Sequence, residues 1–371
     1  MGQITDYLPI GDWIVQLSPI LSYPRKAIVE LTMECNLNCI YCFRRACNET
    51  FGVMSEKVFS RVLSELKHSG VKRIIFTGWG EPLTHPKVLE YLSMAKNAGF
   101  NIVLNTNGTL LETFAEDIVK IGVDEVVVSI DAVDESIYGK LRYPGTASKV
   151  LRGLQELYKA QKRQDKVILL GLEFTTTTLN YTQLPKIITL ATNVKAVYIR
   201  LSNIIPINKE MEEYACFMND QCRKEIMKYI DIVSKLVLEY PVRLFKVNFE
   251  LKAQRTCPIV SDNCLFVGWD GKISPCLHYG HSYQTYLYGI RRRINRIIFG
   301  DVMKDSLINI WRRKDYHSFR FMARTGYLPS CLDCEVAEYC VFTENNLMDC
   351  WGRSPTCAHC PFIYGLSACP L

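Results

Sequence analysis

The sequence lacks the long apolar segment that a membrane-spanning helix requires. No run of eighteen or more apolar residues occurs among its 371 residues, and a helix needs about twenty to cross a bilayer. The first residues, MGQITDYLPIGDW, also lack a basic stretch followed by an apolar one, so no signal peptide is predicted. We therefore expect a cytoplasmic protein without a membrane partner.

A strong excess of one charge is also missing. The 44 Lys and Arg residues against 38 Asp and Glu leave a formal charge of only +6. Basic residues gather in two short runs, at 291–296 and 312–314. Such runs are usually a solvated face, although they would also suit an acidic partner or a phosphorylated ligand. No nucleic-acid-binding module accompanies them, so nucleic acid is not expected as a partner.

Cysteine, by contrast, is abundant, with sixteen residues. Disulfides are a poor explanation where no secretory signal is seen, whereas close-spaced reduced cysteines are typical of metal or iron–sulfur ligands. Ten of the sixteen lie from Cys257 to Cys369, so the metal load is expected in the C-terminal part. Cys216 and Cys222 fall outside every group and are predicted to be structural.

Between residues 27 and 206, short β-rich runs alternate with helical stretches. The predicted strands are residues 27–33, 71–78, 100–108, 124–132, 167–177 and 196–206. The predicted helices are residues 55–68, 86–99, 114–122, 149–163 and 181–192. Continuous apolar strands that alternate with helices imply a buried parallel sheet. Because six units are fewer than the eight of a complete barrel, an α/β fold with a partial (βα)6 TIM-like barrel is predicted.

Four segments are expected along the chain. They are an N-terminal extension at 1–25, the barrel at 26–207, a largely helical bridge at 208–255 and a small Cys-rich domain at 256–371.

Three cysteines directly follow the first predicted strand, as Cys35, Cys39 and Cys42 in CNLNCIYC. Three thiolates on one loop can hold three irons of a [4Fe–4S] cluster and leave the fourth iron open for a ligand. A zinc site would need a fourth protein ligand unless it were catalytic. The carboxyl ends of barrel strands face the active site, so we predict an open-iron cluster there.

This cysteine triad is the defining motif of the radical S-adenosylmethionine (SAM) superfamily, which the sequence resembles. The resemblance implies that the amino and carboxylate groups of SAM chelate the open iron. An electron from the cluster then breaks a carbon–sulfur bond of SAM, and the 5′-deoxyadenosyl radical abstracts a hydrogen atom from substrate. The electron donor would be a protein such as ferredoxin or flavodoxin. The cofactor does the hard chemistry, and no general base is identifiable from the sequence alone.

Further strand ends resemble the SAM-binding elements of that superfamily. In Thr77-Gly-Trp-Gly80-Glu81-Pro, small residues would let the backbone approach the ligand, and Glu81 would pair with an ammonium group. Trp79 departs from this pattern, since the superfamily usually has Gly there. Glu173 and Arg200 are charges within predicted strands. Such charges are costly unless paired, so both are expected to face the barrel interior and contact SAM. Arg142 is a weaker candidate for a SAM contact. The expected SAM contacts are Gly80, Glu81, Asn107, Ser129, Asp131, Glu173 and Arg200.

The C-terminal cysteines resemble those of the SPASM domain, which binds two auxiliary [4Fe–4S] clusters. The implied ligands are Cys257, Cys264, Cys276, Cys331, Cys334, Cys340, Cys350, Cys357 and Cys360. By analogy, the inner cluster would use Cys257, Cys264, Cys276 and Cys350, and the outer one Cys331, Cys334 and Cys340 with Cys357 or Cys360. The family usually has three residues between the third and fourth cysteines of this group, whereas nine residues separate Cys340 from Cys350. The last ligand of each cluster therefore stays open. The alternative is one or two zinc-ribbon-like sites.

The run CVFTENNLMDCWGRSPTCAHCPFIYGLSACP, together with GWGEP, resembles a narrower group. These are the cofactor-modifying proteins, or maturases, associated with tungsten-containing aldehyde ferredoxin oxidoreductases. The resemblance implies action on the pterin cofactor or on the oxidoreductase that receives it. A more distant resemblance is to the molybdenum cofactor synthase that rearranges a purine nucleotide. The alternative is a SPASM-type maturase that oxidises or cross-links side chains of a peptide or protein. A simple electron carrier is disfavoured, because it needs no open iron.

Overall fold

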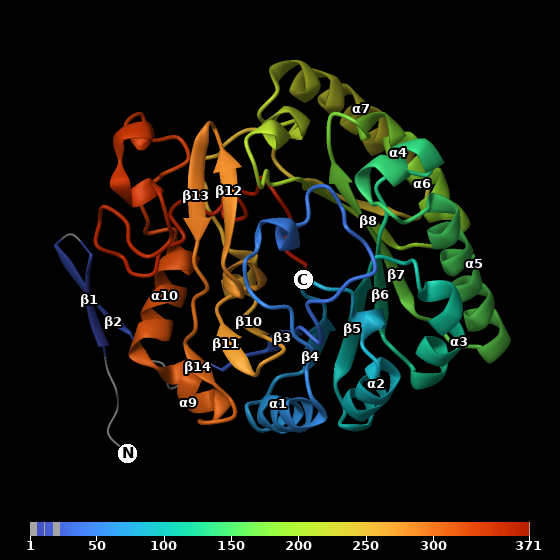
Figure 1. The fold of residues 1–371 in the computed structure, drawn as a ribbon, viewed down its shortest axis with the longest axis horizontal. Helices are drawn as coiled ribbons and strands as arrows, with labels where there is room; N and C mark the ends of the chain where they lie inside the picture. Colours follow the sequence, from blue (N-terminus) through green and yellow to red (C-terminus); the bar gives the residue numbers. More distant parts are fainter. Residues whose placement is uncertain (1–5, 11, 18–22, 371) are drawn as a thin grey trace.

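A ten-stranded sheet organises the chain (Figure 1), in a computed structural model that describes residues 6–10, 12–17 and 23–370. Its strands lie in the order β14-β11-β10-β3-β4-β5-β6-β7-β8-β9. The central six are β3 (Lys26–Val29), β4 (Arg73–Phe76), β5 (Asn101–Thr106), β6 (Glu125–Ser129), β7 (Leu169–Thr176) and β8 (Tyr198–Asn203). They pair in parallel in chain order, which confirms the predicted partial barrel.

Helices cover the outer face of this curved sheet (Figure 1). They are α1 (Glu56–His68), α2 (Val88–Asn97), α3 (Leu111–Ile121), α4 (Glu135–Leu141), α5 (Ala147–Gln164) and α6 (Leu184–Asn193). The side chain of Ser55 accepts a hydrogen bond from the Val58 amide and caps α1. The short helix α4 is an addition to the predicted elements. The apolar faces of these helices pack on the sheet and bury it. The polar groups that chemistry requires therefore lie in the loops at the ends of the strands.

The sheet continues beyond the predicted barrel at both edges. On one edge, β9 (Arg243–Phe245) pairs in parallel with β8. On the other, β10 (Cys264–Val267) pairs in parallel with β3, followed by the antiparallel strands β11 (Lys272–Ser274) and β14 (Gly300–Asp301). The Cys-rich segment therefore shares a sheet with the barrel. The bridge at 208–255, predicted to be largely helical, holds helix α7 (Asp220–Glu239) but also contributes β9.

Among the described residues, the strands and α-helices not yet named are two hairpins and three helices. The hairpins are β1 (Asp6–Ile10) with β2 (Trp13–Leu17), and β12 (Tyr283–Leu287) with β13 (Ile290–Ile294); the helices are α8 (Pro258–Ser261), α9 (Leu307–Arg312) and α10 (Lys314–Thr325). Of the predicted extension at 1–25, residues 1–5, 11 and 18–22 lie outside the described residues. In the ranges that the structure describes, no helix is long and apolar enough to cross a membrane.

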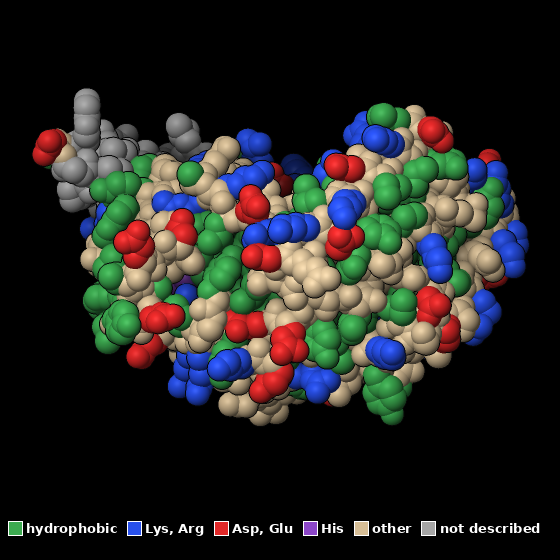
Figure 2. Space-filling model, turned by 90° about the horizontal axis from the view of Figure 1, so that it is seen from above, with side chains coloured by type: hydrophobic (Ala, Val, Ile, Leu, Met, Phe, Trp, Pro, Cys, Tyr) green, Lys and Arg blue, Asp and Glu red, His purple; other side chains and the backbone are tan. Residues whose placement is uncertain are grey.

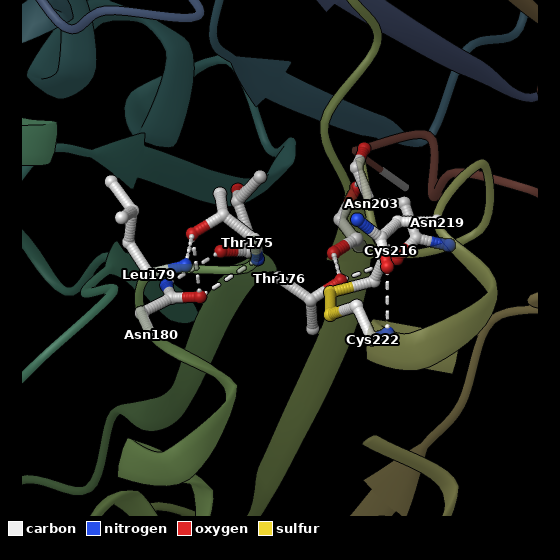
Figure 3. The surroundings of a disulfide bond; sticks show 10 residues. Thr175, Thr176, Leu179, Asn180, Asn203, Cys216, Asn219 and Cys222 are labelled. Atoms are coloured by element: carbon white, nitrogen blue, oxygen red, sulfur yellow. Dashed lines mark hydrogen bonds between the residues drawn. A yellow bond between two sulfur atoms is a disulfide. The ribbon is translucent and has the colours of Figure 1, made fainter. Parts of the chain in front are cut away.

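Cys216 and Cys222 form a disulfide at the start of α7 (Figure 3). The Cys222 amide donates to the side chain of Asn219, which caps the helix. Both cysteines are buried. A sulfur held in a disulfide cannot also bind iron as a thiolate, so this pair is separate from the cluster ligands.

Leu265 tests whether the Cys-rich part and the barrel form one folding unit. It is fully buried on β10, opposite Ala27 of β3. We expect Leu265→Ala to lower the free energy of unfolding by about 2–5 kcal/mol, with one transition for the whole chain in anaerobic denaturant titration. Leu238→Ala on α7 is the control, because that side chain is 85% exposed. Similar losses in the two variants, or two separate transitions, would contradict the shared sheet.

Candidate functional site

A cavity of about 280 Å³ opens at the carboxyl ends of the barrel strands. One wall carries the cysteine loop, with Cys35, Cys39 and Cys42. The other lining residues that were expected to bind SAM are Gly80, Glu81, Asn107, Ser129 and Glu173, joined by Arg142. The folding of parallel strands thus brings together residues that are more than 100 positions apart.

The three thiols of the loop influence one another. Burial, with smaller contributions from the nearby Cys42 and Cys35 thiols, raises the pKa of Cys39 to about 12, although Arg142 opposes the rise. A buried thiolate is therefore costly unless a positive charge compensates it, as the irons of a cluster would. In the described part of the chain, no three Cys, His, Asp or Glu side chains are placed to hold a single metal ion. A cubane cluster asks for a different arrangement, because each thiolate binds its own iron.

Asn107 supports the cysteine loop. Its side-chain amide donates to Cys35 Sγ at 3.7 Å and to Asn36 Oδ1 at 2.9 Å. Its Oδ1 accepts from the amide and the hydroxyl of Thr109. Asn107 lines the cavity, as expected for a SAM contact. Its side-chain hydrogen bonds, however, go to residues of the cysteine loop, so the side chain also positions that loop.

Asp131 has a similar supporting position. The side chain is fully buried and accepts hydrogen bonds from Arg142 Nε at 2.6 Å, from the Thr175 amide at 2.8 Å and from the Tyr41 hydroxyl. Tyr41 stands between Cys39 and Cys42 in the chain. Asp131 is not among the residues that line the cavity. It therefore braces the cysteine loop from behind, which differs from the ligand contact that the sequence predicted.

Glu81 joins the loop after β4 to the end of β5. Its Oε1 accepts from the Thr106 hydroxyl at 2.6 Å and the Leu83 amide at 3.1 Å, and its Oε2 accepts from the Asn107 amide at 2.7 Å. Burial raises the pKa of this carboxyl, and these hydrogen bonds oppose the rise. The carboxylate is thus held in one orientation at the cavity wall.

The neighbouring Gly80 and Trp79 are explained by what surrounds them. A Cβ atom on Gly80 would lie 2.3 Å from the carbonyl oxygens of Thr32 and Glu34, so no side chain fits. The Trp79 indole donates to the carbonyl of Leu277 at 3.2 Å and packs edge-on against Tyr283, 5.0 Å between ring centroids. Trp79 therefore occupies the seam with the Cys-rich part, where a Gly would leave a gap.

Glu173 and Arg200 form an ion pair across β7 and β8, with 3.0 Å between Oε1 and Nη1. Arg200 also donates to the carbonyl of Cys369 at 3.5 Å. Glu173 lines the cavity, whereas Arg200 does not. The two charges are thus paired, as charges within strands require.

His281 was missed by the sequence analysis. It is buried, with Nε2 2.8 Å from Glu30 and Nδ1 2.9 Å from Glu49. Carboxylates only accept hydrogen bonds, so an imidazole that bonds to two of them through both nitrogens is the protonated form. Burial alone would lower the pKa of His281, but the two hydrogen bonds outweigh it and raise the pKa to about 9. The only sequence signal was Glu30, a charge within a predicted strand.

The C-terminal cysteines fall into two groups. The outer group is Cys331, Cys334, Cys340 and Cys350. Burial, and then the charges of Cys350, Asp349 and Cys334, raise the pKa of Cys331 to about 12, and Cys350 in turn neighbours Cys340. A turn brings Cys350 here, because Asp349 accepts from the amides of Trp351 and Arg353. Cys350 thus differs from its expected inner position.

The inner group lines a second, small cavity. Its members are Cys257, Cys276, Cys357, Cys360 and Cys369. Cys357 and Cys360 therefore differ from the outer position that the resemblance implied, and Cys369 is an addition. The predicted ligand Cys264 lies on β10 outside the lining of this cavity and is close enough to Cys369 to affect its charge.

His278 stands between the two cavities. Its ring stacks on Phe362, with centroids 3.5 Å apart, and meets Phe43 edge-on at 5.6 Å. Both His278 and Phe362 line the large and the small cavity. Within the described ranges, neither ring nitrogen of His278 has a hydrogen-bond partner, and burial lowers its pKa to about 3. A neutral imidazole offers one donor and one acceptor.

The basic run at 291–296 is not a continuous charged surface. Arg292 is buried and donates to the carbonyl of Leu287 at 2.9 Å. Arg296 pairs with Asp270 at 2.9 Å. On the face shown in Figure 2, basic and acidic side chains are interspersed. The phosphorylated ligand suggested for this run therefore gains no support.

His281 generates a test of pH dependence. Its raised pKa stabilises the fold fully below about pH 6.5, and the contribution is lost as the pH rises through 9. The expected loss is about 3 kcal/mol over this window. Cys47, Arg296 and Tyr283 lie nearby and carry ionisable groups of their own. The quantity to compare is therefore the pH dependence of the free energy of unfolding in wild type and in His281→Gln, measured by anaerobic denaturant titration. His68→Gln, on the exposed end of α1, is the control. Parallel slopes for wild type and His281→Gln would contradict the buried charge.

Known structures share this fold. SuiB of Streptococcus suis bound to S-adenosylmethionine superposes with a TM-score of 0.62 at 15% identity, covering 87% of this chain and 73% of SuiB. Native anSMEcpe with bound AdoMet gives a TM-score of 0.62 at 17% identity, covering 86% and 88%. At these identities, the likeness concerns the fold alone.

Sequence relatives identify the family. Residues 29–176 match the radical SAM superfamily, and residues 257–335 match the SPASM iron–sulfur cluster-binding domain. The probable GTP 3′,8-cyclase of Methanocaldococcus jannaschii is 26% identical over 68% of this chain and 85% of its own. The tungsten-containing aldehyde ferredoxin oxidoreductase cofactor-modifying protein of Pyrococcus furiosus is 30% identical over 351 residues, 92% of this chain and 96% of its own. The chain therefore belongs to the radical SAM enzymes with a SPASM domain and, among them, to the family of that cofactor-modifying protein.

Proposed function

We propose that this radical SAM enzyme modifies a tungsten pterin cofactor or the aldehyde oxidoreductase that receives it. The relative from Pyrococcus furiosus, named for such cofactor modification, supports this over nearly its whole length. When bound, the [4Fe–4S] cluster and SAM supply the 5′-deoxyadenosyl radical, and the SPASM domain adds auxiliary clusters. A donor such as ferredoxin or flavodoxin and a cytoplasmic location stay predictions.

The residues have separate tasks in this proposal. Cys35, Cys39 and Cys42 hold the cluster at the cavity. The cavity-lining residues that contact SAM are Gly80, Glu81, Asn107, Ser129 and Glu173. Asp131 and Arg200 act one step away: Asp131 positions the cysteine loop through Tyr41, and Arg200 orients Glu173.

The observation that carries the proposal is the placement of His278 and Phe362. They line both the large cavity and the inner cysteine cavity. A substrate in the large cavity would lie between the radical source and an auxiliary cluster. Aromatic faces at Phe43 and Phe362 suit a planar heterocycle. The free nitrogens of His278 suit its polar edge, since a buried polar group left unpaired costs about 1–3 kcal/mol.

The test compares substrates in anaerobic, reconstituted enzyme with SAM and reductant. We expect 5′-deoxyadenosine formation to rise with tungsten pterin cofactor released from an aldehyde oxidoreductase, or with its apo-oxidoreductase, together with a mass change of that substrate. A mass change on a peptide alone would instead support the peptide-modifying alternative. Deoxyadenosine that rises with none of these substrates would contradict the proposed substrate class.

Two variants sharpen this test. His278→Phe keeps an aromatic ring on Phe362 but removes both nitrogens, so we expect roughly tenfold slower product formation with unchanged deoxyadenosine formation in the absence of substrate. The triple variant Cys35→Ala/Cys39→Ala/Cys42→Ala should form no deoxyadenosine. An unaltered product rate in His278→Phe would remove this residue from substrate binding.

A further inference from the structure

The segment that follows α4 lies along the cysteine loop. The backbone amide of Asn38 donates to the carbonyl of Tyr143 at 2.7 Å, and the backbone amide of Ile40 donates to the carbonyl of Leu141 at 3.0 Å. Residue numbers rise along one segment as they fall along the other, so the two segments run antiparallel. One residue of each segment therefore lies between the two hydrogen bonds, opposite its counterpart.

Cys39 and Arg142 are these two residues. Both line the large cavity, and in the part of the chain that the structure describes Arg142 is the only Lys or Arg that does so. The Arg142 side chain is otherwise buried. Burial raises the pKa of Cys39, and the charge of Arg142 is the next-largest influence and lowers it. The register thus places a cation beside one of the three cysteines that hold the cluster.

Asp131 fixes how this cation is oriented. Its carboxylate accepts from Arg142 Nε at 2.6 Å and also from the Tyr41 hydroxyl. Asp131 is fully buried and does not line the cavity, whereas Arg142 does. Arg44 of the cysteine loop donates to the carbonyl of Leu37 at 3.4 Å and does not line the cavity either. The positive end of the ion pair between Arg142 and Asp131 therefore faces the cavity.

We propose that Arg142 sets the reduction potential of the SAM-binding cluster by placing its charge opposite Cys39, and that Asp131 positions it there. When a donor reduces the cluster, one electron is added and no bond forms or breaks, so the site gains one negative charge. Arg142 stabilises that charge and raises the potential, since the net charge around a cluster helps to set its potential. The inference rests on the radical SAM family and the register of the loop, and not on the proposed substrate.

The experiment compares Arg142→Gln with Asp131→Asn, which remove opposite charges of one ion pair. Each protein is reconstituted anaerobically and titrated with titanium(III) citrate, and the electron paramagnetic resonance signal of the reduced clusters is measured. The signal that is missing from the triple variant Cys35→Ala/Cys39→Ala/Cys42→Ala belongs to the SAM-binding cluster. At one solution potential, we expect Arg142→Gln to lower the ratio of reduced to oxidised cluster about tenfold, which is roughly 59 mV for one electron. Asp131→Asn should raise that ratio.

Further variants separate this effect of charge from a folding defect. Lys140→Gln removes one positive charge from an exposed side chain of α4 and should keep the wild-type potential. Arg142→Lys keeps the charge and should stay closer to wild type than Arg142→Gln. Shifts of the same sign in Arg142→Gln and Asp131→Asn, or no shift in either, would overturn the proposal. If Arg142→Gln binds too little iron to titrate, Asp131→Asn decides, because a ratio at or below that of wild type would equally overturn it.

Discussion

The pairing of β10 with β3 is the constraint on which the rest of the structure depends. β3 leads directly into the loop that carries Cys35, Cys39 and Cys42, and its two neighbours are β4 of the barrel and β10 of the Cys-rich segment. The loop is therefore placed by both parts of the chain. Because β10 lies in the same sheet, the Cys-rich segment lies beside the barrel, and its residues His278 and Phe362 line both the large cavity and the inner cysteine cavity.

Side chains reinforce this junction. Trp79 follows β4 and reaches the carbonyl of Leu277, and His281 lies between Glu30 and Glu49, which come from either side of the cysteine loop. The replacement of the usual Gly by Trp79 is thus a packing adaptation at the seam. A protonated imidazole between two carboxylates adds an electrostatic contact that burial alone would disfavour.

Several polar residues near the cavity act by positioning other groups. Asp131 holds Arg142 and Tyr41, and Arg200 is paired with Glu173; neither Asp131 nor Arg200 lines the cavity. A buried charge that is fully hydrogen-bonded has little capacity left for a ligand. The residues that line the cavity and the residues that support them therefore form two layers. In the sequence, both kinds are polar residues at the ends of strands, so the sequence does not show which of them reach the cavity.

The sequence by itself determined the class of the protein and much of its fold. The spacing of Cys35, Cys39 and Cys42 and the alternation of strands and helices are local patterns, and β3 to β8 followed them in order. Which cysteines share a site was decided only by tertiary structure. In the chain, Cys350 is closer to Cys357 than to Cys340, but the turn at Asp349 directs Cys350 to the outer group, whereas Cys357 lines the inner cavity. The spacing of cysteines does not predict such a choice, because it does not determine the direction in which the chain returns after a turn.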